Sequence, residues 1–311
     1  MKKVALVKDQ THYYPLYKTI LEEFGIQVKL YDIWKENQIN ELLYDSFDGF
    51  IWRAKHNPPI KRLAKRLVYL FKIHNIPTHP TWTDYWHFDD KIAQSFLYKK
   101  NDVAVPETEI FFSRDKALDF IDRATFPLIY KCAHGAGSSN VGLLTSRQDA
   151  RRYAKKAFGK GIRTYYKENP QKGYVYFQEY ISGPSEDYRV VCFGEKIMNG
   201  YGRIFERKND FRAHRIKRKE IVVNDSLLQF VADIHNTLGH SIMAYDIMDR
   251  GGENWVVNEM SAIFGDLDQN ILLDTTLTYF KTGDSWISEQ TSDTHVTRTM
   301  NIVLKEQWKW F

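Results

Sequence analysis

The first third of the chain alternates short apolar runs with longer segments in which apolar residues recur every three or four positions. The runs at residues 4–8, 27–31 and 49–53 predict strands, and the periodic segments at residues 16–24 and 61–72 predict helices. This alternation is typical of a small parallel sheet, because a crossover helix must carry the chain back before the next parallel strand. The N-terminal third is therefore predicted to form an α/β unit.

Two further groups of elements follow a polar and aromatic stretch at residues 78–86, which contains Pro80 and is expected to be a connector. The pattern then predicts a helix over residues 89–99, a strand over 108–112 and an N-capped helix over 113–124. From residue 175 onward strands dominate. They are expected at residues 175–180, 188–193, 196–203, 241–249 and 255–260, with a helix at 226–238.

The segment FPLIYKCAHGAGSSNVGLL, residues 126–144, carries the most distinctive local pattern. An apolar run ends in Lys131, and a glycine-rich loop over residues 135–142 leads into a second apolar run, which predicts a β-hairpin. Such a loop lets backbone N–H groups close on an anion, and Lys131 would add its charge. It matches neither GxxxxGK[ST] nor GxGxxG. A phosphate-binding loop and a plain flexible hairpin are both compatible with this segment.

Composition limits the classes of function. The 311 residues are 43% hydrophobic, enough for a core divided into two or three lobes. The net charge of +5 suits anionic ligands but is too small for a nucleic-acid-binding protein. Cys132 and Cys192 lie in apolar runs without a CxxC pattern, which favours a reducing compartment. No nucleic-acid partner is expected.

The N-terminal segment MKKVALVKDQ has too short an apolar run for a signal peptide, and no stretch is long enough to span a membrane. We therefore expect a cytoplasmic protein without a membrane partner. The sequence leaves a homo-oligomeric state open.

Two acids lie within neighbouring predicted strands. Asp246 lies between Tyr245 and Ile247, and Glu259 lies between Asn258 and Met260. A carboxylate in a mainly apolar strand is costly unless it is paired or bound to a metal. Facing acids suit one or two Mg²⁺ ions that also contact phosphate oxygens. A pair of edge-strand acids in salt bridges is the alternative.

Several arginines follow the strands of the last third. Arg189 opens one strand, Arg203 closes the next, and Arg212 follows in a basic loop. Arginines that converge on such a site would neutralise charge on a transferring phosphoryl group, whereas a solvated basic loop is the simpler interpretation.

Together and in this order, these pieces resemble the ATP-grasp superfamily, most closely the ribosomal-protein glutamate ligases and bacterial glutathione synthetases. The resemblance runs from about Asp90 to Asp268. It implies an α/β fold with α+β lobes: a parallel-sheet pre-ATP-grasp domain over residues 1–87, a central lobe with a glycine-rich lid over 88–176, and a C-terminal lobe with a Mg²⁺ site over 177–311.

The resemblance also implies roles for individual residues. It implies ATP ligands in both lobes. It also implies that Arg203 and Arg212 are catalytic residues that face the triphosphate. The implied ATP-binding residues are Lys91, Lys131, Gly135, Gly137, Ser138, Ser139, Gln178, Glu179, Tyr180, Ile181, Asp187 and Arg189.

The metal ligands follow the family with one departure. Asp246 and Glu259 match its magnesium acids, with Mn²⁺ as the alternative ion. Where the family has a metal-binding asparagine two residues after the glutamate, this chain has Ser261, and Asn258 precedes the glutamate instead. Ser261 and Asn258 both remain candidates for a further ligand.

The implied reaction joins a carboxylate to an amine. ATP phosphorylates the acid to an acylphosphate, and the amine then displaces phosphate, leaving ADP and an amide. The substrates would be small-molecule or peptide acids and amines, which the sequence does not identify. The alternatives are a dipeptide ligase of the D-alanine type and a non-catalytic ATP-binding scaffold of the synapsin kind.

Overall fold

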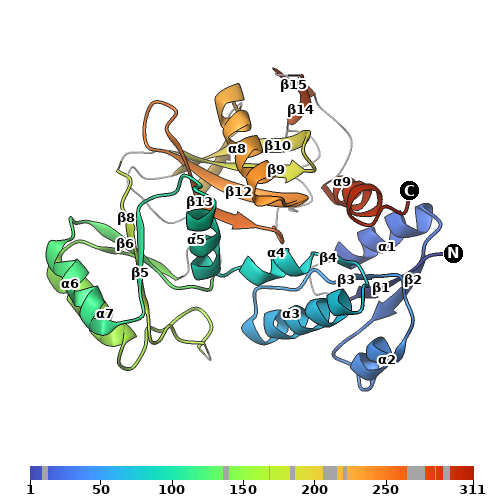
Figure 1. Ribbon diagram of the computed structural model, residues 1–311, viewed down its shortest axis with the longest axis horizontal. Helices are drawn as coiled ribbons and strands as arrows, with labels where there is room; N and C mark the ends of the chain where they lie inside the picture. Colours follow the sequence, from blue (N-terminus) through green and yellow to red (C-terminus); the bar gives the residue numbers. More distant parts are fainter. Residues whose placement is uncertain are drawn as a thin grey trace.

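Three β-sheets organise the chain in a computed structural model (Figure 1). The structure describes residues 1–8, 13–135, 140–167, 169–182, 186–205, 216–219, 223–264, 277–283, 285–289 and 295–311. An N-terminal body, a middle lobe and a C-terminal lobe each contain one sheet. Within the described residues, no helix is long and apolar enough to cross a membrane.

The N-terminal sheet is parallel, as predicted, with the strand order β2-β1-β3-β4. Its interior is apolar because every residue of β3 and four of the five residues of β1 are buried. The strands and helices of this body are β1 (Lys3–Val7), α1 (Tyr13–Glu23), β2 (Gln27–Tyr31), α2 (Gln38–Tyr44), β3 (Gly49–Ile51), α3 (Pro58–Ile73) and β4 (Thr78–His79).

The prediction of a connector at residues 78–86 is wrong. This stretch forms β4 and most of the helix α4 (Trp82–His87). Thr81 and Asp84 form a capping box: the Thr81 hydroxyl accepts the Asp84 backbone N–H, and the Asp84 carboxylate accepts the Thr81 N–H. Such a box stabilises a helix start even in a stretch too short to show periodicity.

The middle lobe holds an antiparallel sheet of order β5-β8-β6-β7, and α6 and α7 pack against it around one apolar core (Figure 1). The predicted hairpin is confirmed, since β6 pairs with β7 and Lys131 lies opposite Val141. The elements are α5 (Lys91–Lys100), β5 (Thr108–Phe111), α6 (Arg114–Arg123), β6 (Leu128–Lys131), β7 (Val141–Leu144), α7 (Arg147–Ala157) and β8 (Val175–Glu179).

The C-terminal lobe is built on a larger sheet of order β13-β12-β9-β10-β14-β15, with β11 paired to β10. Its three central pairings are antiparallel, and α8 contributes a row of buried apolar side chains to the same core. The elements are β9 (Glu186–Phe193), β10 (Ile197–Phe205), β11 (Ile216–Lys219), α8 (Asp225–Leu238), β12 (Ile242–Asp249), β13 (Trp255–Ser261), β14 (Thr278–Thr282) and β15 (Ser285–Glu289).

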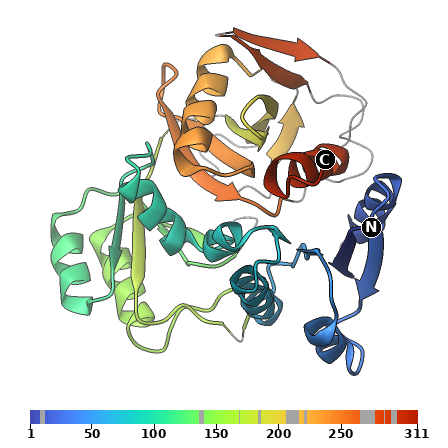
Figure 2. The same cartoon turned by 45° about the vertical axis from the view of Figure 1, so that its right-hand side comes forward.

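The end of the chain returns to its beginning. The helix α9 (His295–Ile302) and the π-helical turn η2 (Val303–Gln307) lie beside α1, with both termini on the same side of the molecule (Figures 1 and 2). Residues of α9 and η2 share one apolar core with β1, β9 and β12. A Cβ on Gly49 would lie 2.6 Å from the Trp308 ring, so this contact requires glycine in β3. The C-terminal segment therefore joins the N-terminal sheet to the C-terminal lobe.

The helix α5 joins the middle lobe to the C-terminal lobe. The Gln94 amide donates to the backbone oxygens of Met260 at 2.8 Å and of His87 at 3.1 Å. Gln94 is buried, so these bonds are shielded from water. The start of α5 is thereby fixed against β13.

Two buried histidines should make the fold sensitive to acid. Burial lowers the pKa of His79 and of His235 from 6.5 to about 4. Between pH 6.5 and pH 4, these histidines bind protons in the unfolded chain but not in the folded chain. The free energy of unfolding should therefore fall as the pH drops from 6.5 to 4, by on the order of 3 kcal/mol per histidine.

Urea unfolding at pH 7, 5.5 and 4 would measure this slope. The variant His235→Gln should have a shallower slope than the unsubstituted protein, and His74→Gln, which changes an exposed histidine, should keep the full slope. Equal slopes for the two variants would contradict the role of burial.

Candidate functional site

The two acids of the sequence analysis are direct neighbours in the C-terminal sheet. Asp246 on β12 is the register partner of Glu259 on β13, and Arg189 on β9 is the partner of Asp246 on its other side. The Arg189 guanidinium binds both carboxylate oxygens of Asp246, at 2.7 and 2.9 Å. Glu259 Oε1 lies 3.1 Å from Lys91 Nζ. Each acid thus pairs with a cation from a different element.

A β-bulge places Asn258 beside these acids. Asp246 pairs with Glu259 but Ile247 pairs with Val257, so Asn258 is an extra residue on β13. A bulge re-aims side chains that strict alternation would send to the opposite face. Asn258 Oδ1 accepts a hydrogen bond from Lys131 Nζ at 2.9 Å.

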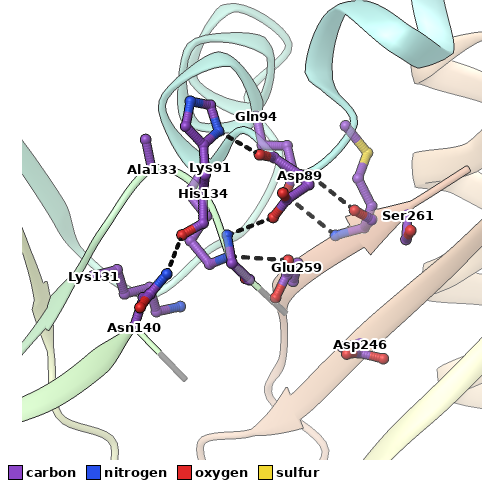
Figure 3. A network of polar contacts seen from close by, with 12 residues as sticks. Asp89, Lys91, Gln94, Lys131, Ala133, His134, Asn140, Asp246, Glu259 and Ser261 are labelled. Carbon is purple, nitrogen blue, oxygen red and sulfur yellow. Dashed lines mark hydrogen bonds and ion pairs between the residues drawn. The ribbon is translucent and has the colours of Figure 1, made fainter. Parts of the chain in front are cut away.

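Lys91 and Lys131 approach the acids from the middle lobe (Figure 3). Lys91 begins α5, and its ammonium also donates to the backbone oxygen of Gly135 at 3.0 Å. Burial lowers the pKa of Lys91, but attraction to Glu259 and Asp89 outweighs burial and the pKa is raised. Burial lowers the pKa of Lys131 to about 8, against the attraction of Glu259. Both lysines are almost fully buried, so their charges act through a medium of low dielectric.

Asp89, which the sequence analysis missed, anchors the start of the glycine-rich loop. Its carboxylate, labelled in Figure 3, accepts the Gly135 backbone N–H at 2.7 Å. It also accepts a hydrogen bond from the Lys61 ammonium at 2.7 Å. Burial would raise the pKa of Asp89, but the His56 ring and the ammonium groups of Lys61 and Lys91 hold it well below its usual range. A φ of 47° at Asp89 turns the chain between α4 and α5. Only the folded chain brings these groups together. The one signal in the sequence is the run Asp89-Asp90-Lys91 at the start of a predicted helix.

The other end of the loop is fixed by Asn140. Its Nδ2 donates to the His134 backbone oxygen at 2.6 Å, and its Oδ1 accepts the Tyr165 backbone N–H at 2.8 Å. A Cβ on Gly135, whose φ is 131°, would collide with the Asn140 amide, so glycine is required there. Gly137, Ser138 and Ser139 lie outside the described residues.

The implied ATP-binding residues Gln178 and Glu179 lie at the end of β8, in the middle lobe. The Gln178 amide donates to Thr108 Oγ1 at 3.0 Å. Glu179 accepts the Glu107 backbone N–H at 2.8 Å and the Arg250 guanidinium at 2.7 Å. The Glu179 carboxylate thus ties β8 to the turn between β12 and β13, through an arginine that the sequence analysis missed. Tyr180 and Ile181 follow directly and are partly exposed.

The remaining predicted residues are spread over the C-terminal lobe. Asp187 is buried on β9, opposite Arg203 on β10. The Ser261 hydroxyl donates to the Ile263 backbone oxygen at 2.8 Å. Arg212 lies outside the described residues, and the Arg203 side chain is not among the described side chains.

Cys132, next to Lys131, does not supply a nucleophile. Its thiol contacts the Gln171 side-chain oxygen at 3.0 Å, and burial raises its pKa to about 12. The thiol therefore stays protonated at neutral pH, and it packs as a small apolar group.

Comparison with known proteins places this arrangement in a family. The model of the RimK-like ATP-grasp domain matches residues 88–267. The chain belongs to this family. The match covers α5, both lysines and both acids, which are the parts that build the site.

Among curated proteins, this ATP-grasp chain is similar to the alpha-aminoadipate–LysW ligase LysX of Sulfurisphaera tokodaii. The two are 21% identical over 179 residues, which cover 56% of this chain and 59% of the relative. The chain thus spans about three-fifths of the length of the curated relatives it matches.

Solved structures confirm the ATP-grasp fold. A RimK-domain ATP-grasp protein of Sphaerobacter thermophilus superposes with a TM-score of 0.55 at 16% identity, over 84% of this chain and 92% of that one. The D-alanine–D-alanine ligase of Bacillus anthracis, solved with ATP, superposes with a TM-score of 0.58 at 12% identity, over 85% and 87%. At these identities the likeness concerns the fold alone.

The buried pair of Lys61 and Asp89 generates a stability prediction. Lys61→Met leaves the Asp89 carboxylate in a buried place without its ammonium partner, which should cost roughly 3–5 kcal/mol in the free energy of unfolding. Lys65→Met removes a lysine one turn further along α3 that bonds a backbone oxygen, and should cost much less.

Urea unfolding of both variants checks this difference. Adding Asp89→Asn to Lys61→Met removes the unpaired charge and should recover part of the loss. Equal stability of the Lys61 and Lys65 variants would contradict the anchoring role of the pair.

Proposed function

We propose that this chain is an ATP-dependent carboxylate–amine ligase that activates its acid substrate as an acylphosphate. The observation that carries the proposal is the meeting of Lys91, Lys131, Asp246 and Glu259, which come from two different lobes. Phosphoryl transfer from ATP needs positioning and neutralisation of charge more than a covalent residue. The site has cations, acids and a glycine-rich loop for this task.

The donor set fits a magnesium ion. Asp246 and Glu259 offer neighbouring carboxylate oxygens, the hard ligands that Mg²⁺ or Mn²⁺ takes in proteins. Bound there, the ion would supply positive charge to the phosphate oxygens of ATP. Asn258, aimed by the bulge at Lys131, and Ser261 are the candidates for a third protein oxygen. In this structure Arg189 pairs with Asp246, and Lys91 pairs with Glu259. When an ion binds, these cations must release the acids or share their oxygens with the ion.

The proposed nucleotide contacts extend the site along both lobes. Lys91 and Lys131 would bind phosphate oxygens, and the backbone after β8 would read the adenine edge. Arg203 and Arg212 would face the transferring phosphoryl group. The other proposed ATP ligands are Gly135, Gly137, Ser138, Ser139, Gln178, Glu179, Tyr180, Ile181, Asp187 and Arg189.

The reaction proceeds in two displacements. A carboxylate oxygen of the acid attacks the γ-phosphorus, the bond to the β-phosphate oxygen breaks, and ADP leaves. The amine then attacks the acylphosphate carbonyl, loses a proton and expels phosphate as the amide forms. Water must be kept away from the acylphosphate, and the glycine-rich segment 135–142 is the proposed lid for this task. Asp89 holds its first residue and Asn140 lies near its end.

A ligase is favoured over a non-catalytic scaffold because this chain keeps both acids and both lysines at one site, with Lys91 bonded to Glu259 and Lys131 bonded to the adjacent Asn258. The similarity to LysX, an alpha-aminoadipate–LysW ligase, supports an amide-forming reaction with a small-molecule or peptide partner. The D-alanine type of dipeptide ligase shares only the fold with this chain and stays an alternative. We keep residues 1–87, 88–176 and 177–311 as the proposed domains.

Single substitutions should separate chemistry from folding. Lys131→Ala and Glu259→Gln should each lower ADP release by about 10²–10³-fold, because each removes one group that stabilises transferring charge. Lys155→Ala, an exposed lysine on α7, should leave the rate unchanged. A near-normal rate for either site variant, in folded protein, would remove that residue from the mechanism.

Trapping the intermediate tests the reaction class. With ATP, Mg²⁺ and a panel of amino acids, hydroxylamine should replace the amine and give a hydroxamate together with ADP and phosphate. Adding the amine alone to ATP should give no product. Release of AMP and pyrophosphate would replace the acylphosphate by an adenylate and overturn the mechanism.

A further inference from the structure

A second cluster of polar side chains lies at the junction of α4 and the C-terminal lobe, apart from the ATP site. One carboxylate oxygen of Asp84 and one ring nitrogen each of His87 and His240 all lie within 4.8 Å of one another. Asp84 and His87 belong to α4, whereas His240 precedes β12. The sequence distance of more than a hundred and fifty residues means that only the fold assembles this cluster.

The cluster is closed to solvent and its hydrogen bonds are incomplete. His87 is 0% exposed, Asp84 6% and His240 8%. Both ring nitrogens of His87 and Nε2 of His240 are buried without a hydrogen-bond partner. A buried polar atom without a partner costs roughly 1–3 kcal/mol, so a ligand bound by His87 would offset part of this cost.

The geometry and the chemistry suit a transition-metal ion. Asp84 Oδ1 and His240 Nδ1 are 3.2 Å apart, close to the roughly 3.3–3.4 Å between donors in tetrahedral Zn²⁺ with bonds of about 2.0–2.1 Å. Two imidazoles and one carboxylate form a ligand set that Zn²⁺ accepts.

The carboxylate is already oriented for such a role. Asp84 Oδ2 accepts the Thr81 backbone N–H at 2.8 Å and the Thr81 hydroxyl at 2.7 Å. These bonds fix the side chain and direct Oδ1 toward the histidines, as the outer-shell partners of metal ligands do. The same capping box therefore starts α4 and aims its acid.

We propose that Asp84, His87 and His240 form a structural Zn²⁺ site, with a water molecule as the fourth ligand. The site would fasten α4 to the start of β12. Asp89 and Lys91 follow α4 directly, and Asp246 lies on β12, so the ion would hold together the two segments that meet at the ATP site. Its burial keeps substrates away from it. This proposal does not depend on the proposed ligase activity.

Metal content tests the site. Untagged full-length protein is equilibrated with Zn²⁺ in excess Mg²⁺ and a chromophoric chelator, dialysed and measured by atomic emission. We expect about one bound Zn²⁺ per chain, as a closed site of this kind holds. Replacement by Co²⁺ should give the strong visible absorption of tetrahedral N/O ligation, and chelation should lower the melting temperature.

Variants locate the ion. Asp84→Asn, His87→Gln and His240→Gln should each lower bound Zn²⁺ at least about tenfold, as expected for loss of a ligand. His235→Gln is the matched control, because His235 is a neighbouring histidine, 1% exposed, with one unpartnered nitrogen but outside the cluster. Glu259→Gln should also retain the ion, which separates this site from the ATP site.

Folded unsubstituted protein that binds no Zn²⁺ under these conditions would overturn the proposal without relying on any variant. Equal loss of Zn²⁺ from the His235 and the His87 variants would also overturn it, because the loss would then reflect disturbed packing. Retention of the ion by the cluster variants would assign it to other side chains.

Discussion

Two carboxylates placed side by side on β12 and β13 impose the electrostatic constraint on which the site depends. Asp246 and Glu259 are register partners, and like charges at such positions repel. Arg189, on the neighbouring strand, neutralises one of them, and Lys91, on a helix of the middle lobe, neutralises the other. The second pairing joins the two lobes, so the charged acids both offer ligands for a cation and hold the two lobes together.

Gly135, the first residue of the glycine-rich loop, is held by the same group of charges. Lys91 binds Glu259 and the Gly135 oxygen, while the Gly135 N–H is held by Asp89, which in turn pairs with Lys61 of α3. One line of contacts therefore runs from the N-terminal body through the loop to the acids. Because Lys61, Asp89 and Lys91 are almost fully buried, each depends on its partner more strongly than a surface residue would. A shift of the N-terminal body relative to the C-terminal lobe would therefore strain the contacts of Gly135.

Packing supports this electrostatic arrangement from two other sides. Gln94 fixes the start of α5 to β13, and α9 with η2 seals the N-terminal sheet against β9 and β12. The close contact of Trp308 with Gly49 joins the two ends of the chain. The lobes are thus held at their outer edges by apolar packing and at the site by charge.

Local pattern in the sequence determined the strands, the parallel N-terminal sheet and the hairpin at Lys131, because periodicity and turn residues act over a few neighbouring positions. It also placed Asp246 and Glu259 on adjacent strands, since a short turn joins them. The helix α4 was not predicted, because its stretch is short, aromatic and without helical periodicity. A capping box at its start stabilises it nonetheless. Only the tertiary structure decided the bulge that aims Asn258, the Glu179–Arg250 pair and the clamp of Asp89 on Gly135. These three features join residues that are far apart in sequence. Their proximity follows from how sheets and lobes pack, and it produces no periodic pattern in the sequence.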